Sequence, residues 1–215
     1  MSLKDLNPVN ASAPKRVAIV ISNPAVSETT GWPIGFWWSE LTHPWYAFTE
    51  KGYAVTIFSP DGGACTADSF SDPRDASGYS STDLISMGFI ATPSLAALID
   101  DTLAIATLDV NAFDAILRHA RLSTGDLLAK GRTVTGFANV EEDFADNAVW
   151  SAGYLSRDTH VQPWRIEDEM RRIGANYVQA GLWRGFAIRD RNLITGQQNF
   201  SGGETAELVI AALGE

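Results

Sequence analysis

The feature that most constrains the fold is a strand–helix–strand pattern near the start of the chain. The β-branched run RVAIVIS at 16–22 is typical of a buried parallel strand. A second run, AVTIFSP at 54–60, is followed by a Gly pair, and an aromatic segment with helical spacing lies between the two runs. A strand, a helix and a second strand at this spacing form a right-handed βαβ unit. We therefore expect an α/β protein built on a mostly parallel sheet.

The aromatic segment IGFWWSELTHPWYAF, at 34–48, raises a question about its one carboxylate. We expect a helix from Ile34 to about Lys51, with Gly52 as the stop. Its apolar stripe consists of Ile34, Trp37, Trp38, Leu41, Trp45 and Phe48. Glu40 lies among these aromatics, where an unpaired carboxylate is costly to bury. Either Glu40 faces a partner in a cleft, or it lies on the polar flank of the helix and reaches water.

The rest of the chain continues the α/β pattern with one interruption. Residues 64–92 are rich in Ser, Asp, Gly and Thr and predict a long capping excursion on the surface. Further elements are a helix beginning at Pro93, a strand beginning FDAI at 113–116, a strand at 132–137, an amphipathic helix at 161–174, strands at 176–181 and 186–196, and a helix from 202. Between 117 and 131 the pattern fails, and we expect only a short irregular piece with a turn at 123–125.

Composition excludes several classes of partner. The net charge of −10 argues against a nucleic acid or an anionic membrane, because neither polyanion is attracted to an acidic protein. No apolar run reaches the roughly 18 residues of a membrane span. The first fifteen residues lack an apolar signal-peptide core. We therefore expect a flexible segment at 1–15, a single domain at 16–215 and a cytoplasmic location.

Cysteine and histidine are too few for a metal centre. The only cysteine, Cys65, excludes an internal disulfide and a cysteine zinc site. Of the three histidines, His43 is expected to pack or cap locally, and His119 and His160 have no acidic or cysteine partner at motif spacing. We expect no metal and no cofactor. Arg165 shares a segment with acidic residues and is interpreted as part of a solvated helix face.

Several stretches together carry a resemblance to a known family. They are RVAIVISNP, TGWPIGFWWSELTHPWYAF, GYAVTIFSPDGG, FDAI, GRTVTGFANVEEDF, QPWRIEDEMRR and NLITGQQNFSG. In this order the chain resembles the ThiJ/PfpI superfamily, and most closely its branch of glutathione-independent glyoxalases and stress chaperones. The resemblance implies a three-layer, flavodoxin-like α/β sandwich and a homodimer. It also implies conversion of methylglyoxal, a small aldehyde, to lactate without a cofactor.

The resemblance also assigns candidate catalytic residues. In the family, a cysteine at a sharp strand-to-helix turn is followed by histidine, and a glutamate hydrogen-bonds the thiol. Glu40 matches that glutamate, and a raised pKa would suit it for donating to the sulfur. Glu141 and Glu142 match the place where some members carry the acidic partner of the histidine, and we take Glu142. The residues by themselves favour a solvated acidic turn at this pair.

The family nucleophile has no counterpart in this sequence. No Cys-His pair occurs, and FDAI runs directly into 117–131, so at least a βαβ unit of roughly 30 residues is missing near 116–117. Cys65 lies in an expected surface loop without a neighbouring histidine. One interpretation is a sequence that omits the segment of an intact enzyme. The other is a shortened, inactive relative that acts as a chaperone-like or protein-binding module. Loss of an interior strand leaves backbone groups unpaired, which favours omission.

Overall fold

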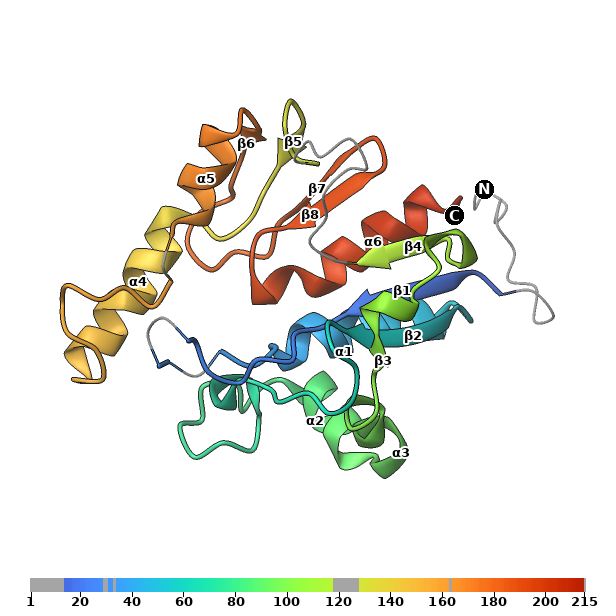
Figure 1. Cartoon of the computed structure of the whole chain (residues 1–215), viewed down its shortest axis with the longest axis horizontal. Coiled ribbons are helices and arrows are strands. Elements are labelled where there is room, and N and C mark those ends of the chain that lie inside the picture. The colour runs from blue at the N-terminus through green and yellow to red at the C-terminus, as the bar shows by residue number, and fades with distance from the viewer. Residues whose placement is uncertain (1–13, 29–30, 33, 118–127, 163, 215) are drawn as a thin grey trace. The chain divides into compact units, whose positions relative to one another are not determined.

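A computed structural model describes residues 14–28, 31–32, 34–117, 128–162 and 164–214 (Figure 1). Most of the predicted N-terminal segment, the predicted turn at 123–125 and His119 lie outside the described residues. The chain divides into two compact units, which are treated separately. Unit 1 contains residues 1–26, 33–118 and 209–215, and unit 2 contains residues 27–32 and 119–208.

Unit 1 is built on the predicted parallel sheet. Strands β1 (Arg16–Val20), β2 (Ala54–Ser59), β3 (Leu103–Ala104) and β4 (Ala115–Leu117) pair in the order β3-β2-β1-β4, with parallel neighbours throughout. The centre of β1 is fully buried at Val17, Ala18 and Ile19. A strand buried on both faces explains the uninterrupted apolar run in the sequence. The α/β fold with a parallel, flavodoxin-like sheet is thus confirmed.

The aromatic helix begins later than predicted. Helix α1 spans Trp38–Glu50, so Ile34 and Trp37 precede it. Residues before the helix are extended instead, because Phe36 pairs with the chain at Ala67. The main-chain N–H of Phe36 donates to Thr66 O at 3.1 Å, and the N–H of Asp68 donates to Phe36 O at 2.8 Å. This bridge holds the entrance to α1 against the following excursion.

The excursion at 64–92 contains a helix that the sequence analysis missed. Helix α2 spans Leu84–Ala91 and is capped by Asp83, whose carboxylate accepts from Ser86 N. Helix α3 (Pro93–Ala96) follows with Pro93 in its first turn, as expected, and continues as a 3₁₀ turn, η2 (Ala97–Ile99). Further 3₁₀ turns are η1 (Ser69–Ser71), η3 (Ile105–Thr107) and η4 (Val110–Ala112).

Unit 2 contains two small sheets and three helical elements. Strand β5 (Thr133–Val134) is parallel to β6 (Asn176–Tyr177), and β7 (Ala187–Asp190) forms an antiparallel hairpin with β8 (Leu193–Gly196). The helices are α4 (Asn139–Ser151), α5 (Ile166–Arg172) and the first part of α6 (Gly202–Ala212), which is preceded by η5 (Asn199–Ser201). Gly174, with φ of 84°, ends α5 as predicted.

The described parallel strands fall into two sheets, and in the sequence the change from one sheet to the other follows residues 116–117, where the resemblance predicts a missing segment. Among the described residues, β4 pairs only with β1, and β5 pairs only with β6. Ile116 and Leu117 are consecutive residues of β4, so the chain continues through this point. The interpretation that a segment has been omitted here, rather than lost, stays a prediction. Across the described ranges, we find no helix with the length and apolar character that a bilayer crossing requires.

Candidate functional site

Helix α4 carries a buried row of carboxylates, so the solvated acidic turn expected at Glu141-Glu142 is wrong. Glu141, Glu142 and Asp146 have exposed fractions of 0%, 3% and 2%. Residues four positions apart are neighbours on a helix surface, which places Asp146 beside Glu142. Only Asp143, with a side chain that is 63% exposed, behaves as a solvated acid. Burial of this many acids requires partners.

Both oxygens of Glu141 are used by the fold. Its Oε2 accepts from Ala138 N at 3.0 Å, which closes the start of α4. Its Oε1 accepts from Trp183 N and from the side-chain amide of Gln197, each at 2.9 Å. Gln197 in turn donates to Gly181 O at 2.9 Å and accepts from Ala180 N at 2.9 Å. Glu141 is therefore a structural carboxylate.

One carboxylate oxygen of Glu142 can still accept a hydrogen bond. Its Oε1 accepts from Ile166 N at 3.3 Å. Its Oε2 is buried and accepts no hydrogen bond from any described residue, although Arg165 Nη1 lies 3.6 Å away. Burial raises the pKa of Glu142, and the Arg165 charge only partly opposes the effect. Of the two glutamates, Glu142 alone can accept a further donor.

Asp146 collects three donors from the segment that leads into α5. Its Oδ1 accepts from Val161 N at 2.8 Å, and its Oδ2 lies 2.6 Å from His160 Nδ1 and 2.8 Å from Arg165 Nη2. His160 therefore does have an acidic partner, fourteen residues away. Arg165 is mostly buried between Glu142, Asp143 and Asp146, so its assignment to a solvated face is also wrong.

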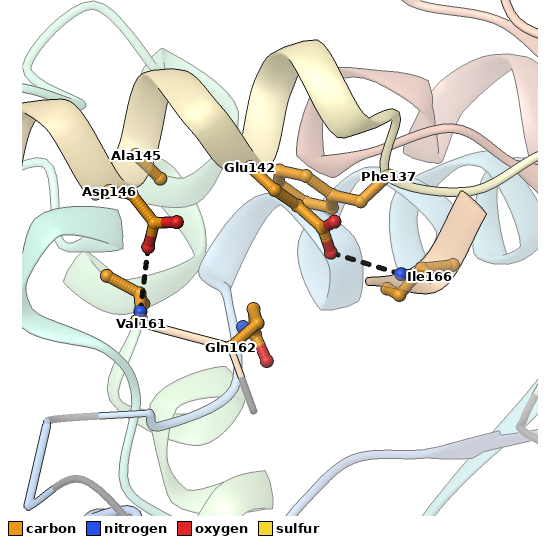
Figure 2. Close-up of a pocket in the computed structure, with 7 residues that line it drawn as sticks. All are labelled: Phe137, Glu142, Ala145, Asp146, Val161, Gln162 and Ile166. Carbon is orange, nitrogen blue, oxygen red and sulfur yellow. Dashed lines mark hydrogen bonds between the residues drawn. The ribbon is translucent and has the colours of Figure 1, made fainter. Parts of the chain in front are cut away.

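A cavity of about 90 Å³ lies between α4 and this segment, wholly within unit 2. Its walls are Phe137, Glu142, Ala145, Asp146, Val161, Gln162 and Ile166. Figure 2 shows the carboxylates of Glu142 and Asp146 extending from α4 on the cavity side, each held by one main-chain N–H of the facing segment. The site thus combines an apolar wall with an acidic one.

Glu40 lies in unit 1, in the first turn of α1, with its side chain exposed to water. The surrounding protein nevertheless desolvates the carboxylate and raises the pKa of Glu40 to about 7. Water can touch a carboxylate that protein atoms still partly surround, so this exposed side chain is also desolvated. A carboxyl in this state can give or take a proton near neutral pH.

The remaining candidates have local roles. Cys65 is buried, which corrects its expected place in a surface loop, and its sulfur lies 3.5 Å from Asn23 Nδ2 and 3.8 Å from Thr102 Oγ1. His43 Nε2 lies 3.0 Å from Asp83 Oδ1 and so links α1 to α2. Among the described residues, no three His, Cys, Asp or Glu side chains are arranged so that they could hold a metal ion.

The residues missed by the sequence analysis are Asp146, His160 and Arg165. The i, i+4 spacing of Glu142 and Asp146 is the one signal that could have joined the first of them to the acidic pair. That spacing becomes informative only once 139–151 is assigned as a helix. The contacts of His160 and Arg165 depend on how the loop at 152–165 folds back along α4, and no local pattern predicts this.

Comparison with known proteins supports the family suggested by the motifs. No family model matches the chain. Over 91 residues it is 33% identical to Glyoxalase 3 from Candida albicans, which covers 41% of this chain and 35% of the relative. The match thus spans about a third of the length of that relative.

Solved structures extend the likeness to nearly the whole chain. Rapid Encystment Protein 24 kDa from Francisella tularensis has a TM-score of 0.76 and 21% identity, over 94% of this chain and 100% of its own. A second crystal structure has a TM-score of 0.72 and 28% identity, over 94% and 98%. Glyoxalase III from Candida albicans has a TM-score of 0.66 and 20% identity, over 92% and 97%.

These findings define the class as α/β proteins with the DJ-1/ThiJ/PfpI fold. The chain therefore has this fold, and over 91 residues it is similar to Glyoxalase 3.

Proposed function

We propose that this protein is a cofactor-independent, cysteine-dependent glyoxalase whose activity requires the Cys-His segment that the sequence lacks. The substrate would be a small 2-oxoaldehyde such as methylglyoxal. The single observation that carries the proposal is the similarity to Glyoxalase 3 over 91 residues. Glu40 lies at the position where the resemblance places a catalytic glutamate, and a pKa raised to about 7 would suit it for proton transfer.

The proposed chemistry balances without a cofactor. A thiolate adds to the aldehyde carbon, and the carbonyl electron pair takes up a proton, which gives a hemithioacetal. The Glu40 carboxylate removes the proton from that carbon and returns it to the neighbouring carbon, while the hydroxyl proton of the hemithioacetal passes to the ketone oxygen. The ketone thereby becomes an alcohol and the hemithioacetal becomes a thioester. Water then hydrolyses the thioester, which releases lactate and restores the thiol. The sum is methylglyoxal plus water giving lactic acid.

Glu142 is the proposed acidic partner of the elbow histidine. Both oxygens of Glu141 are engaged by main-chain and side-chain donors, whereas Oε2 of Glu142 accepts no hydrogen bond among the described residues. A buried acceptor of this kind is suited to receive an imidazole N–H and to hold its tautomer. We also propose a cytoplasmic location and a homodimer. Light scattering of the purified protein would test the dimer, and cell fractionation would test the location.

The decisive experiment compares the chain with and without a restored segment. We expect the chain itself to convert no methylglyoxal, because no thiol is placed to attack. Insertion of a family elbow of roughly 30 residues between Ile116 and Leu117 should restore lactate formation. In that background E40Q should lower the rate by about 10²–10⁴-fold, as loss of a general base does. E50Q, at the exposed end of α1, is the matched control.

Two outcomes would contradict this function. Conversion by the chain itself would refute the need for a Cys-His nucleophile. A restored protein that folds but forms no lactate would refute the enzymatic proposal.

A non-catalytic binding module is the second candidate, and one feature of unit 2 favours it. Phe144 and Phe200 are 50% and 53% exposed, and both pack edge-on against Trp183. Exposed aromatic clusters of this kind are typical of protein-binding surfaces. Suppression of the aggregation of an unfolded client protein by the chain itself would support this candidate. The double variant F144S/F200S should abolish the effect, and its persistence there would contradict it.

A further inference from the structure

The cavity between α4 and the segment 161–166 has the composition of a binding site rather than of a packing defect. An unoccupied packing defect is normally apolar on every side. Here Phe137, Ala145, Val161 and Ile166 supply apolar surface, and Glu142 supplies a carboxylate. At ~30 Å³ for each water molecule in the liquid, 90 Å³ corresponds to about three waters or a compound of four to five heavy atoms.

One oxygen at this cavity needs a donor. Oε2 of Glu142 is buried, and the described residues give it no hydrogen bond. Its ion-pair partner Arg165 is 3.6 Å away at Nη1, because Nη2 of the same guanidinium is held at 2.8 Å by Asp143 and by Asp146. A buried acceptor without a hydrogen bond is costly, so a donor that enters the cavity is favoured. The chain contains no Cys-His pair to provide one.

The charged side chains around Oε2 of Glu142 determine which kind of hydrogen-bond donor can bind there. Both oxygens of Asp146 already have donors in Val161, His160 and Arg165, so Oε2 of Glu142 is the carboxylate oxygen of this cavity left without a hydrogen bond. The carboxylates of Glu142, Asp143 and Asp146 outnumber the single guanidinium, which disfavours an anion. A cation would meet Arg165 next to the same oxygen. A neutral hydroxyl compound avoids both penalties.

Gln162 determines what the occupant needs at the end of the cavity that opens to solvent. Its side chain lines the cavity and is also exposed, so its amide lies where the cavity meets solvent. An amide can donate to a carbonyl or accept from a hydroxyl. The occupant should therefore carry a hydroxyl at one end, a short apolar body and a polar group at the other end.

We propose that this cavity binds a neutral three-carbon hydroxy compound, with its hydroxyl donating to Oε2 of Glu142. The inference rests on the residues of unit 2 and does not depend on the catalytic proposal. Binding at this cavity requires no nucleophile, so the chain can bind the compound without a Cys-His segment.

The test is a titration of the isotope-labelled chain with hydroxyacetone, followed by the amide resonances of Ala145, Val161 and Ile166. A compound of five heavy atoms should bind with a dissociation constant of about 1–100 mM. Acetone, which lacks the donor, should bind about 10-fold more weakly or not at all. Lactate, which has a similar size but is anionic, should not shift these resonances. Acetone or lactate binding as well as hydroxyacetone would overturn the proposal.

Variants separate the cavity from the surface of the helix. A145L fills the cavity without altering a charge and should reduce hydroxyacetone affinity at least about 10-fold. A148L places the same side chain on the exposed side of α4 and should leave the affinity unchanged. The spectrum of each variant shows directly that it is folded. Equal affinity in A145L and A148L, or no shifts in the wild-type chain up to about 500 mM, which lies beyond the expected range, would overturn the proposal.

Discussion

The main-chain N–H of Trp183 donates to Oε1 of Glu141 at 2.9 Å and so ties a buried helix carboxylate to an unusual turn. Trp183 has φ of 54°, in the left-handed region that residues other than glycine rarely occupy. Such a conformation costs on the order of 1 kcal/mol or more unless the surroundings hold it. Glu141 provides that hold, and the ring of Trp183 then packs edge-on against Phe137.

We expect E141Q to destabilise the protein by about 2–3 kcal/mol. The carboxylate accepts three N–H donors in a fully buried place, whereas glutamine would direct its own NH₂ toward at least one of them. Urea unfolding followed by tryptophan fluorescence would measure the change. E207Q, an exposed position on α6, should stay within about 0.5 kcal/mol of the wild type. Equal stability of the two variants would show that Glu141 carries no such role.

The sheet of unit 1 could be predicted because its pattern is local. The β-branched run at 16–20 marks β1, and Pro60 directly follows the end of β2. Both strands formed where expected. The start of α1 was predicted too early because the periodicity of the aromatics extends past the real helix boundary. A tertiary contact, the bridge between Phe36 and Ala67, decides that boundary.

The carboxylate cluster could not be predicted, because its partners are distant in sequence. Glu142 and Asp146 look like solvated acids until Arg165 and two main-chain N–H groups, fifteen or more residues away, are brought to them. Polar residues enter a core only when such partners exist, and a sequence read in short windows shows none of them. The family resemblance indicated the pair Glu141-Glu142 but could not divide its roles.

Gly35 should tolerate no side chain. A Cβ at this position would lie 2.3 Å from the carbonyl carbon of Ala67 and 2.4 Å from Thr66 O, and both neighbours are backbone atoms that cannot move aside. We expect G35A to lower the free energy of unfolding by about 1–3 kcal/mol. G203A, in the first turn of α6 with no atom within 4 Å of the added Cβ, should be neutral or slightly stabilising. Thermal melts of both variants make the comparison, and a neutral G35A would mean that the bridge is not tightly packed.

Asp83 should make the protein sensitive to strong acid. Burial raises the pKa of Asp83, but hydrogen bonds with His43 and Ser86 outweigh that effect and lower it to about 2. Because the pKa in the folded state is depressed, the stabilisation is complete above the unfolded value of 3.8 and is lost as the pH falls toward 2. The shift corresponds to about 2 kcal/mol. D83N should therefore be less stable than the wild type at pH 6 and equally stable near pH 2, as measured by urea unfolding. A difference that stays constant with pH would assign the effect to capping alone.

Glu40 should titrate near neutrality and destabilise the folded chain as it ionises. Desolvation raises the pKa of Glu40 from 4.5 to about 7, so the folded state holds its proton more tightly than the unfolded state does. The stability that this provides is complete below pH 4.5 and is lost as the pH rises through 7. The Tm of E40Q relative to the wild type should accordingly increase between pH 4.5 and 7 and level off above that range. Carbon-13 NMR of the side-chain carboxyl, assigned by its absence in E40Q, should show a midpoint near 7. A midpoint near 4.5 would mean that water solvates the carboxylate freely, and the proton-transfer role proposed for it would have no physical basis.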